Sequence, residues 1–158
     1  MGERSFETPR HFADYVVRPN LTEFNENTSS LKAAFNSIMS IDALVGQIFE
    51  QQKRMGIDTA KNDSDFRNDL AGENENFQLV RDVAKSFKHT SLDRGDPLVQ
   101  RADQTGVGGR SYGASLYGVG SFDGEEVMVK TNNGDEKHLL SVATEAFTYL
   151  ETKIKAES

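Results

Sequence analysis

The sequence of 158 residues predicts an α+β domain that is mainly α-helical. We expect a bundle of about four helices, a small C-terminal antiparallel β-meander and a closing helix. Apolar residues recur at spacings of three and four through most of the first 90 residues and again after residue 141, which is the period of a helix with one buried face. Between these stretches lie many glycines and two Asx-Gly pairs, which are typical of hairpin turns.

The first helix is expected to begin at Pro9 with Thr8 as its N-cap, because proline lacks an N–H that would be unpaired there. Pro19 is expected to end or kink it near Arg18, with helix resuming afterwards. Its expected buried face consists of three apolar side chains at helical spacing: Phe12, Tyr15 and Val16.

A second helix is expected from the start signal at 28–30 to about Arg54, ended by Gly56. This helix of roughly 25 residues has an apolar arc wide enough to be contacted from two sides. The arc consists of Leu31, Ala34, Phe35, Ile38, Ile41, Ala43, Leu44, Val45, Ile48 and Phe49.

The acidic segment 58–76 is expected to contain a short helix, Asp63 to Ala71, with Gly72 as its C-terminal glycine. A further helix is expected from about Glu75 to Lys88. Its expected buried side consists of Phe77, Val80, Val83, Ala84 and Phe87.

After residue 90 the pattern favours turns and short strands. A strand is expected at 98–102, a second at 127–129 after the Asp-Gly turn at 123–124, and a third at 137–140 after Asn133-Gly134. A last helix is expected over about 141–156, with Val142, Phe147, Leu150 and Ile154 facing inward. Residues 1–158 are expected to form one domain: a helical part over about 8–90, the loop and hairpin part over 91–140, and the closing helix.

Composition excludes several kinds of site. The absence of cysteine excludes thiolate catalysis, cysteine-ligated zinc, iron–sulfur clusters and disulfides. The net charge of −7 has the wrong sign for coating nucleic acid through charge alone. His11, His89 and His138 are far apart in sequence, so no metal or cofactor is expected. The chain has no apolar run of membrane-span length and no apolar signal-peptide core near its start, so we expect a cytoplasmic protein without a membrane segment.

The helix over 75–88 carries the densest set of polar side chains. Asp82, Ser86 and His89 share one side, but a catalytic triad is not expected because serine would lie between the other two. We interpret this side as a solvated helix face, with an Asp82–Lys85 or Asp82–Ser86 contact and a cationic last turn that suits the helix dipole. An alternative use is phosphate or RNA binding by the local cations Lys85, Lys88, His89, Arg94 and Arg101.

The glycine-rich segment 106–124 matches no nucleotide-binding motif. Gly106 and Gly108 lack the third glycine of the dinucleotide fingerprint, because Ser111 stands in its place, and no P-loop sequence occurs. Tyr112 and Tyr117 are candidate ligand-stacking residues. The alternative is that such aromatic residues fold back over the helices.

Arg81, Asp82 and His89 resemble the motif of the HEPN superfamily, which comprises ribonucleases and toxin-type domains. This resemblance implies RNA cleavage at a site formed across a dimer, with Asp82 as helper. The HEPN motif has four to six residues between arginine and histidine, whereas seven separate them here, so the two side chains would diverge by about 80° around the helix.

The chain also resembles a group of uncharacterised small bacterial proteins. The likeness rests on the Ala33-Ala34-Phe35-Asn36 stretch, on the Arg-Asp-x-Ala-x-x-x-Lys-His helix at 81–89 and on the Gly/Tyr segment before the terminal hairpin. It implies a shared fold and no particular activity.

The sequence favours a non-catalytic interaction or ligand-binding module, with a homo-oligomer or a protein partner expected. Its candidate ligand-binding residues are Lys85, Lys88, His89, Tyr112 and Tyr117. The alternative is a HEPN-like endoribonuclease that uses Arg81 and His89 across a dimer. A small-molecule sensor built on the long helix is a third possibility.

Overall fold

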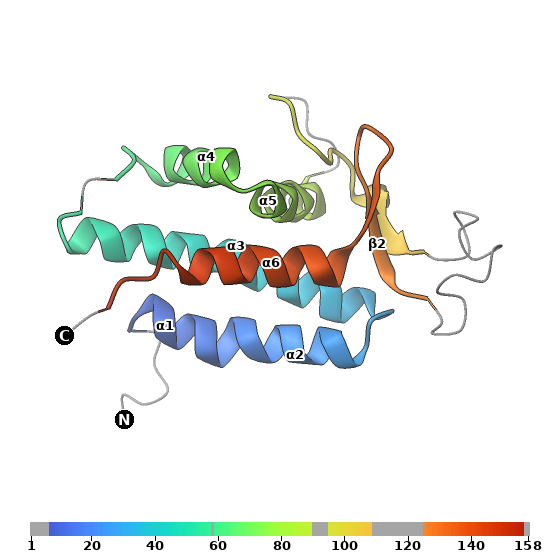
Figure 1. Ribbon diagram of the computed structural model, residues 1–158, viewed down its shortest axis with the longest axis horizontal. Coiled ribbons are helices and arrows are strands. Elements are labelled where there is room, and N and C mark those ends of the chain that lie inside the picture. The colour runs from blue at the N-terminus through green and yellow to red at the C-terminus, as the bar shows by residue number, and fades with distance from the viewer. Residues whose placement is uncertain (1–6, 58, 90–94, 109–124, 157–158) are drawn as a thin grey trace.

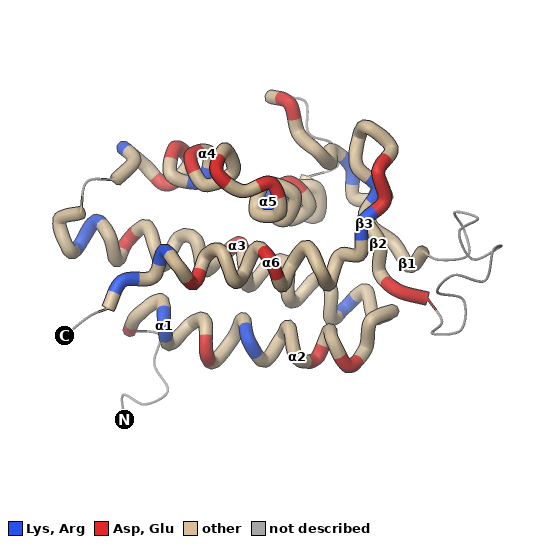
Figure 2. The backbone as a smooth tube through the Cα atoms, viewed as in Figure 1, with Lys and Arg blue, Asp and Glu red and all other residues tan. Residues whose placement is uncertain are grey.

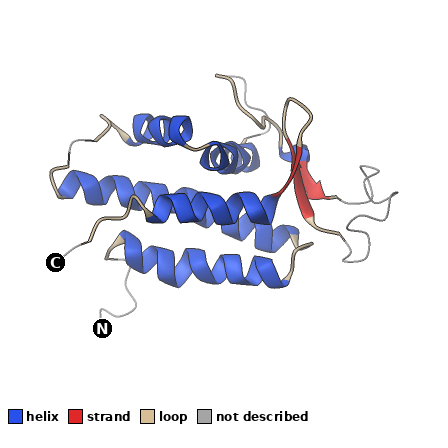
Figure 3. Ribbon diagram, in the orientation of Figure 1, coloured by secondary structure: helices blue, strands red, loops and turns tan. Residues whose placement is uncertain are grey.

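The computed structural model describes residues 7–57, 59–89, 95–108 and 125–156. It confirms a mainly helical α+β fold (Figure 3). The elements in chain order are α1 (Pro9–Phe12), a π-helical turn (Ala13–Val17), α2 (Arg18–Glu26), α3 (Leu31–Arg54), α4 (Asp63–Glu73), α5 (Glu75–Lys88), a 3₁₀ turn (Ala102–Gln104), β1 (Thr105–Val107), β2 (Val127–Lys130), β3 (Glu136–His138) and α6 (Leu139–Glu151).

The long helix α3 lies at the centre of the bundle (Figure 1). The α1–α2 segment packs on one side of α3 and α6, and α5 packs on both from the other side, beside α4. The small sheet lies at one end, where β2 and β3 contact α6. The core is therefore a helical interior closed at that end by Val127 and Val129 of β2.

The first helix begins as predicted, since the Thr8 hydroxyl accepts the His11 N–H at 3.1 Å. The predicted buried face was right in part: Phe12 packs against the core, whereas Tyr15 is 50% exposed and Ala13 and Val17 are fully buried. The cause is the π-helical turn before Pro19, in which the Arg18 N–H bonds to the carbonyl of Ala13, five residues back. Such a turn inserts one extra residue, shifts the helical face and accommodates a proline that cannot donate to the preceding turn.

Helix α3 confirms its prediction at both ends. The Ser30 hydroxyl accepts the Ala33 N–H at 3.0 Å, and Gly56 adopts a φ of 71° beyond the last turn. The Gly56 and Ile57 N–H groups bond to the carbonyls of Lys53 and Gln52, so the final carbonyls are satisfied by a left-handed glycine cap. As its wide apolar arc predicted, α3 is contacted from two sides, by the α1–α2 segment and by α5. Three residues of the predicted arc are exposed: Leu31, Phe35 and Ala43.

The boundary between α4 and α5 corrects the assignment of Gly72. Helix α4 continues through Gly72 to Glu73, and Asn74 ends it by donating its N–H to the Leu70 carbonyl. The Asn74 side chain also accepts the Phe77 N–H at 2.9 Å and so begins α5. One asparagine serves both helix ends, which removes the need for a glycine cap.

The sheet order is β1-β2-β3, antiparallel throughout, with Thr105 opposite Val129 and Met128 opposite His138. The strand predicted at 98–102 was wrong, and the described strand begins at Thr105. The N–H of Leu98 bonds to the Asp82 carboxylate, and those of residues 100 and 101 bond to the Gln104 side chain. Backbone donors held by side chains cannot form a strand ladder.

The second predicted turn is present, with Gly134 at a φ of 97°. Helix α6 begins at Leu139, within the strand predicted at 137–140, because Leu139 is fully buried on the same face as Val142, Ala143 and Ala146. The helix ends at Glu151, so Ile154 packs against the core from beyond it. The predicted Asp-Gly turn at 123–124 lies outside the described residues.

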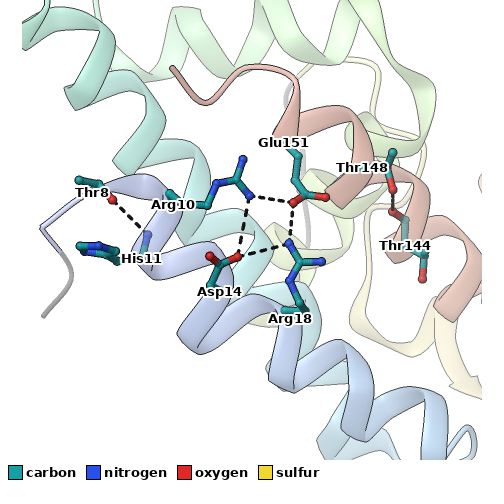
Figure 4. Close-up of polar contacts among 8 residues, drawn as sticks. All are labelled: Thr8, Arg10, His11, Asp14, Arg18, Thr144, Thr148 and Glu151. Atoms are coloured by element: carbon teal, nitrogen blue, oxygen red, sulfur yellow. Dashed lines mark hydrogen bonds and ion pairs between the residues drawn. The ribbon is translucent and has the colours of Figure 1, made fainter. Parts of the chain in front are cut away.

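Basic and acidic positions alternate along the α1–α2 segment (Figure 2), and three of them form a network with α6. Glu151 of α6 accepts from Arg10 at 2.9 Å and from Arg18 at 2.6 Å (Figure 4). Asp14 lies 3.3 Å from Arg18 and 3.9 Å from Arg10. The hydrogen bond and charge of Glu151 raise the pKa of Arg18 above its ordinary value, despite opposing desolvation. The network therefore ties the first and last helices together.

We expect Glu151→Ala to lower the free energy of unfolding by about 1 kcal/mol at low salt, since the network is partly exposed and screened. Urea denaturation at low and high salt measures this. Thr148→Ala, on the neighbouring turn of α6, serves as control because its hydroxyl donates to the Thr144 carbonyl and, within the described residues, takes no part in the ionic network. A salt-independent loss in Glu151→Ala would contradict an ionic role.

Candidate functional site

The expected solvated face on α5 was wrong for Asp82 and Ser86, which are buried, whereas the cationic last turn is confirmed, since Lys85 and Lys88 lie there and are exposed. Asp82 is 2% exposed and Ser86 is 1% exposed. The Asp82 carboxylate accepts the Leu98 N–H at 2.8 Å and the Arg81 Nε–H at 3.4 Å, and the Ser86 hydroxyl donates to the Val83 carbonyl at 2.7 Å. A tertiary contact causes this burial: the segment that contains Leu98 and the buried Val99 packs against α5 and covers Asp82.

The backbone of His89 is extended, unlike the helical backbone of Asp82 and Ser86. His89 is the C-cap of α5, with φ −131° and ψ 146°, and its side chain is exposed. The described residues show no hydrogen bond between His89 and either Asp82 or Ser86. His89 leaves the helical path that carries Arg81, so helical spacing does not determine the relation between these two HEPN-motif positions.

The remaining cations of α5 form one row. Arg81, Lys85 and Lys88 follow each other at spacings of four and three, which places them along one side of the helix. Arg67 of α4 joins this row through Asp42 of α3. We call Arg67, Arg81, Lys85 and Lys88 the cation stripe.

Two buried carboxylates position the cation stripe. Asp42, which is 8% exposed, accepts from Arg67 at 2.7 Å and from Lys88 at 3.2 Å. Arg81 contacts Asp82 and also donates to Asn68 at 2.8 Å. Because each acid is fixed in the core, its cationic partners have less freedom than lysine and arginine side chains on an open surface.

Burial shifts the pKa of two groups in this site. Desolvation raises the pKa of Asp82, opposed by the Leu98 hydrogen bond and by Arg81. Desolvation and the charge of Arg81 lower the pKa of Lys85, opposed by Asp82 and Asp42. Arg67 also pairs with Asp63 at 2.8 Å, so Asp42, Asp63 and Asp82 balance part of the positive charge of the stripe. An external anion would stabilise the charged form of Lys85.

Exposed apolar side chains adjoin this stripe. Leu31 is 51% exposed and Phe35 is 44% exposed on the first turns of α3. The Phe35 ring lies 5.4 Å from the half-buried ring of Phe87, the residue that precedes Lys88. Leu31, Phe35 and Phe87 form what we call the apolar edge.

Sequence reasoning found Arg81, Asp82, Lys85 and Lys88 but missed Asp42, Arg67 and Phe35 as parts of one site. Asp42 gave a usable signal, because a carboxylate within the apolar run of α3 is rarely buried without partners. Arg101 instead pairs with Asp103 at 3.0 Å, on the 3₁₀ turn. Arg94, Tyr112 and Tyr117 lie outside the described residues. Among the residues that are described, no group of three or more histidine or acidic side chains is placed to hold a metal ion.

Comparisons with known proteins add no family: no family model, characterised protein or solved structure matches this chain. Within the described ranges, none of the helices combines the length and the apolar character needed to span a membrane.

Proposed function

We propose that this chain is a non-catalytic interaction module whose surface, made of the cation stripe and the apolar edge, docks an acidic and partly apolar segment of a partner protein. One observation carries the proposal: the exposed Phe35 ring packs on Phe87, the residue that precedes Lys88, in a chain of net charge −7. We place the protein in the reducing cytoplasm, and its lack of cysteine is compatible with that location.

Charge favours an acidic partner segment over a second copy of the chain. Each copy has net charge −7, so association of two copies meets overall repulsion, whereas an acidic segment gains local attraction at the stripe. The buried partners Asp42 and Asp82 hold the cations in place before binding, which reduces the entropy lost on docking. Apolar groups on the partner would cover Phe35 and Phe87.

The test is a titration of the ¹⁵N-labelled protein with a helical peptide of leucines and glutamates, and with the same peptide carrying lysine in place of glutamate. We expect the acidic peptide to shift the amide signals of Phe35, Phe87 and Lys88. Phe35→Ser should weaken binding about tenfold, as expected for an exposed aromatic anchor. Met55→Ser is the matched control, because Met55 is 43% exposed against 44% for Phe35 and lies at the far end of α3.

Equal weakening in Phe35→Ser and Met55→Ser, or equal binding of both peptides, would contradict the proposed surface. A native mass spectrum that shows a dimer would instead favour a second copy as the occupant. The HEPN-like alternative requires such a dimer and RNA cleavage that His89→Ala abolishes. We expect no cleavage, because Arg81 is already engaged by Asn68 and Asp82.

A further inference from the structure

A separate hollow lies between the start of α1 and the segment that follows α6. Its volume is about 430 Å³, and it is lined by Thr8, Arg10, His11, Ile154, Lys155 and Ala156. Three of these six residues are basic or protonatable, two are apolar and none is acidic. This lining contrasts with the net charge of −7 of the chain and favours an anion.

The basic groups of this hollow have unused binding capacity. Within the described part of the chain, the Lys155 ammonium has no ion-pair partner. An ammonium without an acidic partner is available to an anion that enters the hollow.

Arg10 can bind a ligand while Glu151 and Asp14, the two acids that it contacts, remain paired with Arg18. Arg18 approaches Glu151 and Asp14 at 2.6 and 3.3 Å, closer than the 2.9 and 3.9 Å of Arg10. Figure 4 shows that Arg10 and Arg18 reach Glu151 from two turns of the α1–α2 segment, with Asp14 on the turn between them. The two acids therefore keep one arginine when the other turns toward an anion.

The position of Lys155 is fixed by the core. The amide of Gln51, a fully buried side chain of α3, donates to the Lys155 carbonyl and accepts the Lys155 N–H, both at 2.9 Å. Gln52 donates to the Lys153 carbonyl at 3.2 Å. These bonds hold the segment after α6 against α3, so the wall of the hollow that carries Lys155 is built into the fold.

We propose that this hollow binds a small oxyanion, a carboxylate or a phosphate, on a molecule with a short apolar part. Lys155 and Arg10 would contact the anion, and Ile154 and Ala156 would cover the apolar part. This inference is independent of the proposed docking surface, which lies on α3, α4 and α5, so the failure of either leaves the other intact.

The experiment titrates the ¹⁵N-labelled full chain with inorganic phosphate and, separately, with butyrate, at constant ionic strength set by chloride. We expect saturable shifts in the amide signals of residues 8–11 and 154–156. A tighter response to phosphate identifies a phosphate ligand, and a tighter response to butyrate identifies a carboxylate with an apolar part. We expect Lys155→Ala to weaken the binding about tenfold.

A control variant makes the test specific. Lys61→Ala removes the same charge outside the hollow and should leave binding unchanged. Shifts that do not saturate with either anion, or equal affinity in Lys155→Ala and Lys61→Ala, would overturn the proposal.

Discussion

Asp82→Ala is expected to lower the free energy of unfolding by about 3 kcal/mol, the scale for breaking a buried charged hydrogen-bond pair. The substitution leaves the Leu98 N–H and the Arg81 guanidinium without the acceptor that they share. It should also loosen the segment 96–100, which Asp82 holds against α5. Urea denaturation followed by circular dichroism measures the loss, and hydrogen exchange at the Leu98 amide reports the local opening.

Asp82→Asn is the matched control, because its amide oxygen still accepts the Leu98 N–H while the charge is removed. We expect it to cost about 1 kcal/mol or less at neutral pH. Burial raises the folded-state pKa of Asp82, so the folded protein holds this proton more tightly than the unfolded chain does. Its contribution to stability is therefore largest below its unfolded pKa and declines as the pH rises through its folded pKa.

The difference in unfolding free energy between the wild type and Asp82→Asn should accordingly shift in favour of the wild type from about pH 7 to about pH 4. Comparing the two proteins at each pH cancels the other titrating groups that they share. If the difference moved in the opposite direction, the charge of Arg81 would lower the pKa of Asp82 by more than burial raises it. An Asp82→Ala variant as stable as the wild type would show that the Leu98 contact contributes nothing.

Phe77→Ala is expected to destabilise the protein by about 4 kcal/mol, as for removal of a large side chain from a packed core. Phe77 is fully buried at the start of α5, where it leaves a cavity if truncated. Phe35→Ala should cost less than about 1 kcal/mol, since its 44% exposed ring already contacts water. The midpoints of chemical denaturation of the two variants give the comparison.

This pair of variants separates folding from binding on one chain. A large loss of stability in Phe35→Ala would mean that the apolar edge belongs to the core and is not a docking surface. Similar, small losses in both variants would contradict the packing of α5 against α3 and α6. The expected result, a folded Phe35 variant, also validates the Phe35→Ser peptide titration.

Local rules in the sequence determined most of the helical fold. Thr8, Ser30 and Gly56 act within a few residues of their own positions, so their caps and stops were predictable without knowledge of the tertiary structure. The limits of α5 followed from the same kind of signal together with its apolar period. The π-helical turn before Pro19 was harder to predict, because proline indicates a disruption but not the way in which a continuous helix absorbs it.

The candidate site depended on contacts between distant residues, and for that reason only part of it was predictable. The sequence determined one row of cations, because the spacings of four and three place Arg81, Lys85 and Lys88 on one side of a helix. The burial of Asp82 depends on Leu98, sixteen residues away, and the pairing of Arg67 with Asp42 spans twenty-five residues. The pattern of polar and apolar side chains within one helix does not show which other segment of the chain packs on each of its faces. Only the tertiary structure therefore decided that Asp82 is an anchor in the core and that Phe35 remains exposed beside the cations.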